Sequence, residues 1–533
     1  MRNIIVAPQP LAVEEGAKVF MAGGNAVDAA VVAAFVQSIV SPHSCGIGGY
    51  AILTMHWQGQ HIALDAPATA GAKVSPAMWE EDVLRPNPDG WGFFLRDRVN
   101  DVGYRSICTP GMLHGLSTML ARWGTMSWKE ALEPAARLAE EGFVVDAHLA
   151  SSWKSRSKYP EGASSFDYLA SNPEAGRIYL HEDGSPHEMG EILRNPDYAQ
   201  TLDHLAEHGV DDFYTGELAE RISADLSANG SFVTAEDLRD YQLRDLSPVV
   251  GTYRGHTVVT APPPHGGPTL VAALNILEGY DLARLGHNSP EYIYLVSMAM
   301  KAAFADRNPT LGDPEFVDVP LEWMISKERA AQWQDHIDAE KPINVSFVPA
   351  GPPDTTHVSV VDAAGNSVAL THSLGSSSGV ITPGLGFMYN NSMVNFHPLA
   401  GHPNSIAPQK SRTTGMTPTI LYRDDEPVMV IGAPGATRII TSVLQVILNV
   451  RDFGMSISEA VWAPRFDCQG DLIKCQARIP EYVCNEVRRR HPIVRLPQSH
   501  GGLALVHAIT IDRETNTVAG AADTGAGGMA LVV

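Results

Sequence analysis

An Ala/Val-rich run at residues 26–40, AVDAAVVAAFVQSIV, limits the possible folds of this chain more than any other segment. Asn25 stands directly before the run and is a good N-cap, so the run is predicted to form a helix. Apolar residues lie on nearly every side of that helix, which is typical of a buried helix rather than a surface one. The run contains Asp28 and Gln37 and is too short to cross a bilayer. The chain must therefore cover this helix with other parts of a folded core.

The composition agrees with a folded chain and excludes two classes of protein. Of the 533 residues, 44% are hydrophobic and only 18% are charged, which excludes a disordered chain. The formal net charge is −22, from 60 acidic and 38 basic residues. Such an excess of acids repels phosphates, and no basic stripe offsets it, so we expect no nucleic-acid partner.

The N-terminus and the cysteines bear on location and on metal binding. The segment MRNIIVAPQPLAVEEG has no apolar run of signal-peptide length, so we expect a cytoplasmic protein with no membrane contact. The five cysteines form no CxxC pair, and we expect neither a disulfide framework nor a zinc site. Four prominent histidines show no HExxH-type spacing and are predicted to be turn and strand residues rather than metal ligands: His43, His265, His357 and His372.

Several other elements can be predicted from local patterns. Residues 51–57 read as a strand, and residues 128–143 and 193–228 read as amphipathic helices. Residues 251–267 read as strands closed by a Pro/Gly turn, and a helix follows that Gly279 should end. Between about 336 and 354 the prolines and the missing helical period indicate an exposed linker.

Two patterns after this linker suggest a site. HVSVV (357–361) and SVALT (367–371) are β-rich runs joined by DAAGN, which predicts a hairpin with Thr355 just before its first strand. Residues 426–450 read as strand, glycine-rich turn and helix, and such a turn can direct backbone N–H groups at one point. Each pattern alone is more often structural than functional.

Many ordered blocks of the sequence together match one known family. The chain resembles the γ-glutamyltransferases, which belong to the N-terminal-nucleophile hydrolases. The blocks are GGNAVDAAV (23–31), SPHSCGIGGY (41–50), CTPGMLHGL (108–116), YRGHTVVTAPPPHGG (253–267), ADRNPTLGDPEFV (305–317), TTHVSVVDAAGNSVALTHS (355–373), GMTPTI (415–420), GAPGATRIITSVLQ (432–445) and APRF (463–466).

The resemblance implies an α/β fold, an αββα four-layer sandwich built from two chains made by self-cleavage. The matching bond is Asp354–Thr355, so residues 1–354 would form a large subunit and residues 355–533 a small one, intertwined in one structural domain. The two subunits would associate as a heterodimer or as a dimer of heterodimers. The implied substrate is a small-molecule amide, with no cofactor and no metal.

The resemblance also assigns catalytic roles. The released Thr355 would carry both the nucleophilic hydroxyl and a free α-amine, and an amine with a pKa near 7.7–8.0 can accept the hydroxyl proton. Two backbone N–H groups form the oxyanion hole in the family; Gly435 matches the first, and Ala436 stands at the second position. Ser373 stands where relatives usually have a threonine that hydrogen-bonds the nucleophile. Asp306 and Asp313 are expected to brace a loop rather than to catalyse.

At the positions that bind a glutamyl group in the family, this chain has different residues. Asp101 stands at the position of the carboxylate-binding arginine, and the nearby Arg105 could replace it. Gly375 stands where an asparagine is expected, and the acid that holds the α-ammonium is replaced by a neutral amide. The remaining substrate-binding positions read Ser392, Asn395, Thr414 and Gly415.

These changes favour one acyl group over another. An Asp facing an ammonium at about 4 Å gains roughly 4 kcal/mol at a near-surface dielectric, and Asn395 cannot supply that charge. We therefore expect an acyl group that has a carboxylate but no α-amine, of the oxamate or glutaryl type. Two alternatives are open: a γ-glutamyl transferase or glutathione hydrolase with a rearranged pocket, and a non-catalytic relative that serves as a binding protein.

Overall fold

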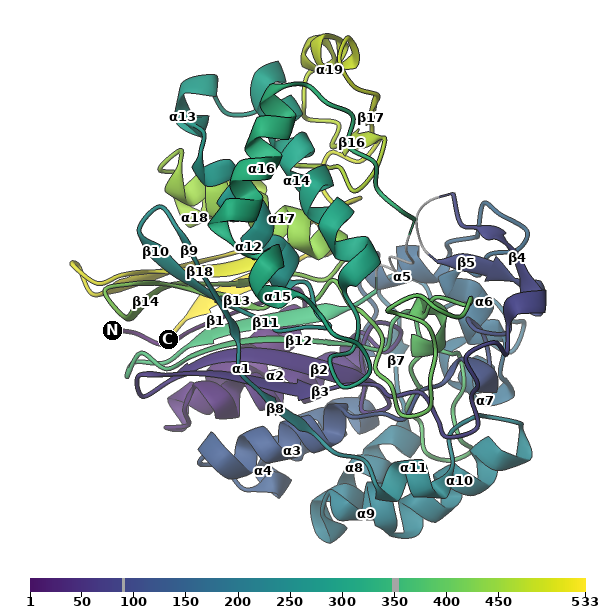
Figure 1. Ribbon diagram of the computed structural model, residues 1–533. Helices are drawn as coiled ribbons and strands as arrows, with labels where there is room; N and C mark the ends of the chain where they lie inside the picture. The colour runs from purple at the N-terminus through teal and green to yellow at the C-terminus, as the bar shows by residue number, and fades with distance from the viewer. Residues whose placement is uncertain (89–91, 348–353) are drawn as a thin grey trace.

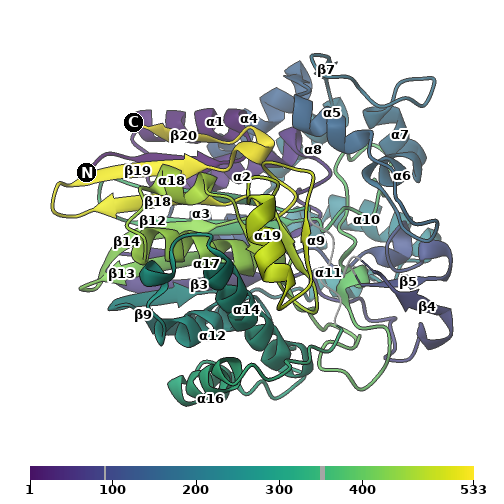
Figure 2. The same ribbon diagram turned by 90° about the horizontal axis from the view of Figure 1, so that it is seen from above.

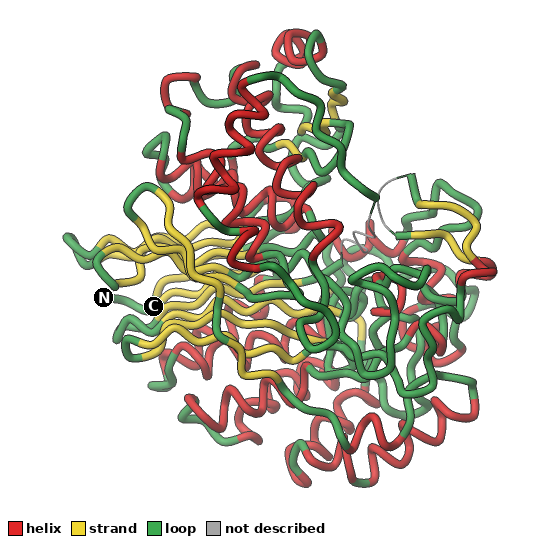
Figure 3. Tube along the Cα trace, in the orientation of Figure 1, coloured by secondary structure: helices red, strands yellow, loops and turns green. Residues whose placement is uncertain are grey.

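Two antiparallel β-sheets lie face to face at the centre of the molecule, and helices cover both outer faces (Figure 1; Figure 3). The computed structural model describes residues 1–88, 92–347 and 354–533. An apolar layer between the sheets includes Ile4, Val259, Val430 and Ile509. The predicted αββα arrangement is therefore confirmed. Within the described ranges, every helix is too short or too polar to traverse a bilayer.

The first sheet has seven strands, drawn from both ends of the chain. In spatial order they are β20 (Met529–Val532), β1 (Ile4–Ala7), β11 (Thr356–Val361), β12 (Ser367–Ser373), β2 (Tyr50–Trp57), β3 (Gln60–Ala66) and β8 (Arg244–Leu246). The β11–β12 pair is the hairpin predicted from the sequence, and its register places Thr356 opposite His372. Strands from before and after residue 354 are thus interleaved in one sheet.

The second sheet has six strands. In spatial order they are β19 (Thr517–Ala522), β18 (His507–Asp512), β14 (Glu426–Gly432), β13 (Thr419–Arg423), β10 (His256–Thr260) and β9 (Val249–Tyr253). Strands β9 and β10 come from the first part of the chain, and the other four come from the part after residue 354. Both chain ends lie at the same side of the sandwich (Figure 1; Figure 2).

Five helices described here cover the outer face of the seven-stranded sheet, and the apolar helix predicted at 26–40 is one of them. They are α1 (Pro10–Met21), α2 (Ala26–Val40), α3 (Met112–Trp123), α4 (Trp128–Glu141) and α8 (Pro196–His208). All residues of α2 are buried, because the sheet covers one side and α1, α3 and α4 cover the others. Asn25 caps α2, and Asp28 completes a capping box.

Helices on the other outer face cover the six-stranded sheet. They are α12 (Gly267–Glu278), α13 (Leu282–Leu285), α14 (Pro290–Thr310), α15 (Leu321–Met324), α16 (Lys327–Asp338), α17 (Arg438–Arg451) and α18 (Ile457–Trp462). Helix α19 (Glu481–Arg488) and the small sheet of β15 (Phe466–Asp467), β16 (Ile473–Cys475) and β17 (Ile493–Arg495) stand beyond them. Gly279 follows α12, as the sequence predicted.

Short elements gather at the end of the sandwich opposite the chain termini (Figure 1; Figure 2). They include β4 (Val83–Pro86), β5 (Phe93–Leu95), α5 (Ala147–Trp153), α6 (Ser165–Ala170) and α7 (Pro173–Tyr179). The ribbon of β6 (Phe143–Val144) and β7 (Ile192–Leu193), α9 (Asp211–Thr215), α10 (Glu217–Ala228) and α11 (Ala235–Arg239) complete this side of the fold.

Two sequence predictions need correction. The helical segment expected at 193–228 is divided into the end of β7 and the helices α8, α9 and α10, because Pro196 starts α8, Gly209 ends it and Gly216 ends α9. The linker expected at 336–354 begins inside α16, which continues to Asp338. Residues 348–353 of that linker lie outside the described residues.

Candidate active site

Thr355 lies immediately before β11, and its hydroxyl faces the carbonyl of the preceding peptide bond. Thr355 Oγ1 donates to the carbonyl oxygen of Asp354 at 2.6 Å and lies 3.0 Å from Ser373 Oγ. Ser373 Oγ also lies 2.8 Å from that carbonyl oxygen and accepts a hydrogen bond from the Gly375 N–H at 2.8 Å. Both side chains are buried. Two hydroxyl groups therefore converge on the Asp354–Thr355 peptide bond.

The hairpin produces this convergence. The two strands are antiparallel, and Thr356 pairs with His372. The residue before Thr356 therefore lies beside the residue after His372, which brings Thr355 next to Ser373 although eighteen positions separate them in the chain. The neighbouring strand β2 places Tyr50 opposite Ser373. Residues directly opposite one another in a sheet project to the same face, so Tyr50 lies on the same face as Ser373.

A cavity of about 640 Å³ opens beside Asp354. Ser376 Oγ donates to the Asp354 carboxylate at 2.6 Å, and both residues line the cavity together with Val394. Arg156 and Lys158, from the segment after α5, add positive charge to the cavity wall. The cavity therefore offers a substrate-sized space next to the Asp354–Thr355 bond.

Asp101 also lines this cavity, but it is held by protein partners. It accepts hydrogen bonds from Tyr168 Oη at 2.8 Å and from Asn391 Nδ2 at 2.9 Å. Burial raises the pKa of Asp101, and these two hydrogen bonds partly oppose the effect. Arg105, the arginine that the sequence offered instead, is exposed in the short turn Tyr104–Ser106 and is not among the residues that line the cavity.

The predicted oxyanion turn follows β14. Gly432, the last residue of that strand, packs against His357, so the turn starts beside the beginning of β11. Gly435 has φ +136° and Ala436 has φ +55°, and neither N–H donates a hydrogen bond within the described part of the chain. A non-glycine residue at such a positive φ costs on the order of 1 kcal/mol. The strained turn therefore presents two unengaged N–H groups.

The loop Thr414–Gly415 packs directly on this turn. A Cβ atom at Gly415 would lie 2.2 Å from the carbonyl oxygen of Ala436, so only glycine fits this backbone. Thr414 Oγ1 contacts His265 Nδ1 at 2.8 Å, and His265 Nε2 lies 3.1 Å from Asp65 Oδ1. The Thr414 hydroxyl is thereby held by a buried histidine–carboxylate pair that the sequence analysis did not connect with the site.

Several buried polar atoms near this loop have no partner within the described residues. They are Ser392 Oγ, Asn395 Oδ1, Arg412 Nε and Thr413 Oγ1. Arg412 is only 4% exposed, its guanidinium lies 4.3 Å from the ring centre of Tyr50, and it donates to the Thr413 carbonyl at 3.3 Å. Because buried polar groups are normally paired, this set indicates a space that a polar ligand or water fills.

Arg412 and Arg307 are buried cations without a carboxylate partner among the described residues. Arg307 is 2% exposed and donates to the Thr414 carbonyl at 3.2 Å, and burial lowers its pKa to about 10. The sequence analysis missed both arginines. Arg412 stands three residues before GMTPTI, so that motif was the signal that could have directed attention to it.

His357 and the two aspartates of ADRNPTLGDPEFV have structural partners. His357 is fully buried, its ring nitrogens contact Thr371 Oγ1 at 2.8 Å and Ser359 Oγ at 2.9 Å, and burial holds its pKa well below the ordinary value. Asp313 accepts hydrogen bonds from Arg244 at 3.0 and 3.1 Å and braces the loop before β13 through Ser411. Asp306 lies inside α14 and pairs with Arg329.

Comparison with known proteins agrees with this fold. Residues 12–533 match the family model described as gamma-glutamyltranspeptidase. The acylase ACY 1 proenzyme of Pseudomonas sp. (strain SE83) is 37% identical over 94% of this chain and 89% of that protein. The glutathione hydrolase proenzyme of Escherichia coli (strain K12) is 33% identical over 88% of this chain and 81% of that protein. The crystal structure of cephalosporin acylase from Bacillus halodurans superposes with a TM-score of 0.87 at 26% identity, covering 99% of this chain and 95% of that one.

The stacked sheets and the similarity to the named enzymes show that this chain is an enzyme of the N-terminal-nucleophile class of amidohydrolases and transferases. Within that class, the chain belongs to the gamma-glutamyltranspeptidase family.

Proposed function

We propose that this protein cleaves its own chain between Asp354 and Thr355 and then acts as an amidohydrolase with Thr355 as the nucleophile. The observation that carries the proposal is the contact of both hydroxyls, Thr355 Oγ1 and Ser373 Oγ, with the Asp354 carbonyl oxygen. Attack of Thr355 Oγ1 on that carbonyl carbon breaks the C–N bond and leaves an ester. Water then hydrolyses the ester, which frees the Asp354 carboxylate and the Thr355 α-amine.

The freed residue can carry the amide chemistry. Its α-amine accepts the hydroxyl proton while Thr355 Oγ1 attacks the substrate amide, and the Gly435 and Ala436 N–H groups meet the developing oxyanion. The leaving amine takes the proton, and water or an amine acceptor releases the acyl group. The interleaved strands support association of the 1–354 and 355–533 segments after cleavage, since each sheet contains strands from both.

The acyl group that we propose carries a carboxylate but no α-amine. Asn395 and Ser392 present neutral polar atoms where an ammonium would need a negative charge. Arg412 offers a buried guanidinium on the Tyr50 side of the sheet, and guanidinium binds carboxylates in a bidentate manner. The named acylase relatives support the same choice. A γ-glutamyl substrate is the second candidate, because a relative at 33% identity is named a glutathione hydrolase.

A denaturing gel of the purified protein tests self-cleavage. We expect two bands for the wild-type chain and one band for Thr355→Ala, because the alanine has no hydroxyl to attack the peptide bond. Thr356→Ala is the matched control: it removes the next hydroxyl along, which contacts Gln37 Nε2 at 2.8 Å, and the two bands should remain. One band from the wild-type chain would refute the proposal and favour a non-catalytic binding protein.

A substrate panel then tests the acyl group. Glutaryl and oxamate amides should be hydrolysed with a higher kcat/KM than the γ-glutamyl amide of the same leaving amine. The glutaryl amide and the γ-glutamyl amide differ only in the α-ammonium group, so the ratio of their kcat/KM values measures the effect of that one group. A preference for the γ-glutamyl amide or for glutathione would overturn the proposed acyl specificity and leave the nucleophile assignment intact.

A further inference from the structure

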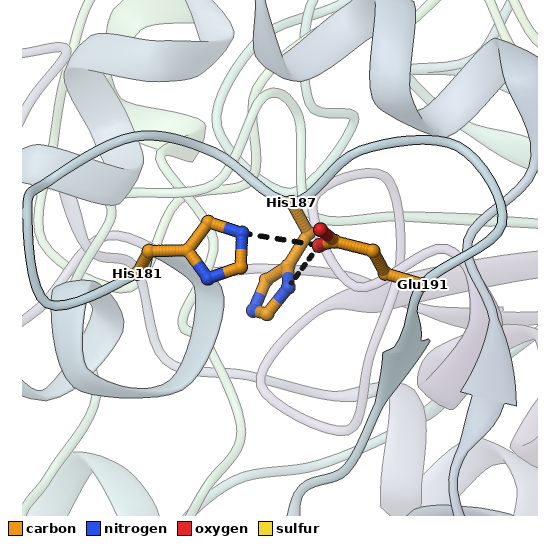
Figure 4. Close-up of side chains that lie close together, drawn as sticks. All are labelled: His181, His187 and Glu191. Atoms are coloured by element: carbon orange, nitrogen blue, oxygen red, sulfur yellow. Dashed lines mark hydrogen bonds and ion pairs between the residues drawn. The ribbon is translucent and has the colours of Figure 1, made fainter.

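Three side chains outside the active site point toward one another in the connection between α7 and β7 (Figure 4). One carboxylate oxygen, Glu191 Oε2, lies 3.0 Å from His181 Nε2 and 2.9 Å from His187 Nδ1. The three candidate ligand atoms all lie within 4.8 Å of one another. Ligand atoms around a tetrahedral Zn²⁺, each about 2.0–2.1 Å from the ion, are roughly 3.3 Å apart. The two histidine–glutamate distances are therefore a few tenths of an ångström shorter than those around a bound ion.

Backbone hydrogen bonds hold this connection in place without any metal. The His181 N–H donates to the Ser185 carbonyl at 2.8 Å, and Leu180 forms an isolated bridge with Pro186. The Glu191 carbonyl accepts from the N–H of the fully buried Val145 at 2.8 Å. The three side chains thus project from a defined loop that is anchored to the core at both ends.

The chemistry of the donors selects the kind of ion. Two imidazoles and one carboxylate suit Zn²⁺ and neighbouring divalent transition metals, whereas Mg²⁺ and Ca²⁺ prefer oxygen ligands. The side chains of His181, His187 and Glu191 are 39%, 15% and 37% exposed, so an ion can enter from solvent. Asp183 stands in the same loop and interacts electrostatically with His181, so it adds negative charge beside the cluster. The second nitrogen of each ring can carry the proton when the first binds metal.

We propose that His181, His187 and Glu191 form a binding site for one Zn²⁺ ion, with water completing the coordination. The sequence analysis expected no metal site, because the spacing from His181 to His187 to Glu191 matches none of the helical or paired motifs that it considered. The ion would hold the loop closed rather than take part in catalysis. The loop also carries Glu188, which pairs with Lys154, and the chain from Ser155 onward lines the cavity beside Asp354.

Calorimetric titration of the chelator-treated full-length protein with Zn²⁺ alone tests the site. We expect one saturable site near neutral pH. Loss of one group that only hydrogen-bonds to a metal ligand costs about 10- to 100-fold in metal affinity elsewhere, so loss of a ligand itself, in His187→Ala or Glu191→Gln, should weaken binding by about 100-fold or more. Hydrogen exchange of residues 181–191 should slow on adding Zn²⁺ to the wild-type protein.

His204→Ala is the matched control, since His204 also contacts a carboxylate, Asp212 Oδ2 at 2.9 Å, but without a second histidine on that oxygen. Its zinc affinity should equal that of the wild-type protein. Zinc binding that persists unchanged in the His187→Ala/Glu191→Gln double variant would place the ion elsewhere and overturn the proposal. Absence of saturable binding in the wild-type protein would overturn it as well. Neither result bears on the self-cleavage gel, so this site and the proposed function fail separately.

Discussion

Arg412 is the residue on which the proposed acyl specificity most depends, and it is buried. A buried guanidinium without an anionic partner is costly unless a ligand pairs with it. We expect Arg412→Gln to raise KM for a glutaryl amide by about 10- to 100-fold, because a charge-assisted hydrogen bond is worth about 1.5–3 kcal/mol. The kcat value should change less, since the nucleophile and the oxyanion turn are untouched. Steady-state kinetics on the cleaved enzyme measures both.

Arg105→Gln is the comparison variant, because the sequence offered Arg105 for the same role and the structure places it exposed. If Arg412 binds the carboxylate, Arg105→Gln should leave KM unchanged. The opposite pattern, a raised KM in Arg105→Gln alone, would assign the carboxylate to the exposed arginine.

At the scale of elements, the turn after β14 and the loop before β13 must fit one another. A Cβ atom at Gly415 meets the Ala436 carbonyl oxygen at 2.2 Å and Thr437 Cα at 2.5 Å. We therefore expect Gly415→Ser to displace the turn and lower kcat by about 100-fold, the typical cost of losing an oxyanion donor. Single-turnover rates of the processed enzyme provide the measurement.

Ala436→Gly should compensate for that change. Glycine adopts φ near +55° without strain and lets the turn move, so Gly415→Ser/Ala436→Gly should recover part of the lost kcat, while Ala436→Gly alone keeps its activity. Additive losses in the double variant would mean that the two segments do not act on one another.

At the scale of the whole molecule, the histidines inside the sandwich limit acid stability. His507 on β18 is fully buried, neither ring nitrogen has a partner among the described residues, and burial lowers its pKa to about 4. Between the ordinary value of 6.5 and about 4, the unfolded chain binds a proton that the folded chain does not. The free energy of unfolding should therefore fall with decreasing pH in this window, by about 3 kcal/mol in total for this one group.

His507→Phe should remove this contribution and make the acid slope shallower by about 1.4 kcal/mol per pH unit. Denaturant unfolding at a series of pH values between 6.5 and 4 measures the slope. His208→Ala, at an exposed position, should leave the slope as it is in the wild-type protein. An unchanged slope in His507→Phe would show that other groups govern acid unfolding.

Local patterns were enough for many elements. Helix α2 and the hairpin β11–β12 follow from hydrophobic periodicity and turn residues within a few positions, so neighbouring residues encode them. The segment 193–228 was mistaken for continuous helix, because its periodicity persists across Pro196, Gly209 and Gly216, where the chain in fact turns. The family resemblance named Thr355, Ser373, Gly435 and Ala436, and the structure brings Thr355 and Ser373 together.

Local sequence patterns could not predict which residues surround the candidate site. Arg412 over Tyr50, Asp65 beside His265, and the unpartnered atoms near Asn395 join segments far apart in the chain. The sequence by itself determined the buried helix, the hairpin and the position of Thr355 just before that hairpin, because their information lies in adjacent residues. Only the tertiary structure decided that Arg412 lies buried over Tyr50 and that His181, His187 and Glu191 meet, because packing between segments sets those distances and exposures.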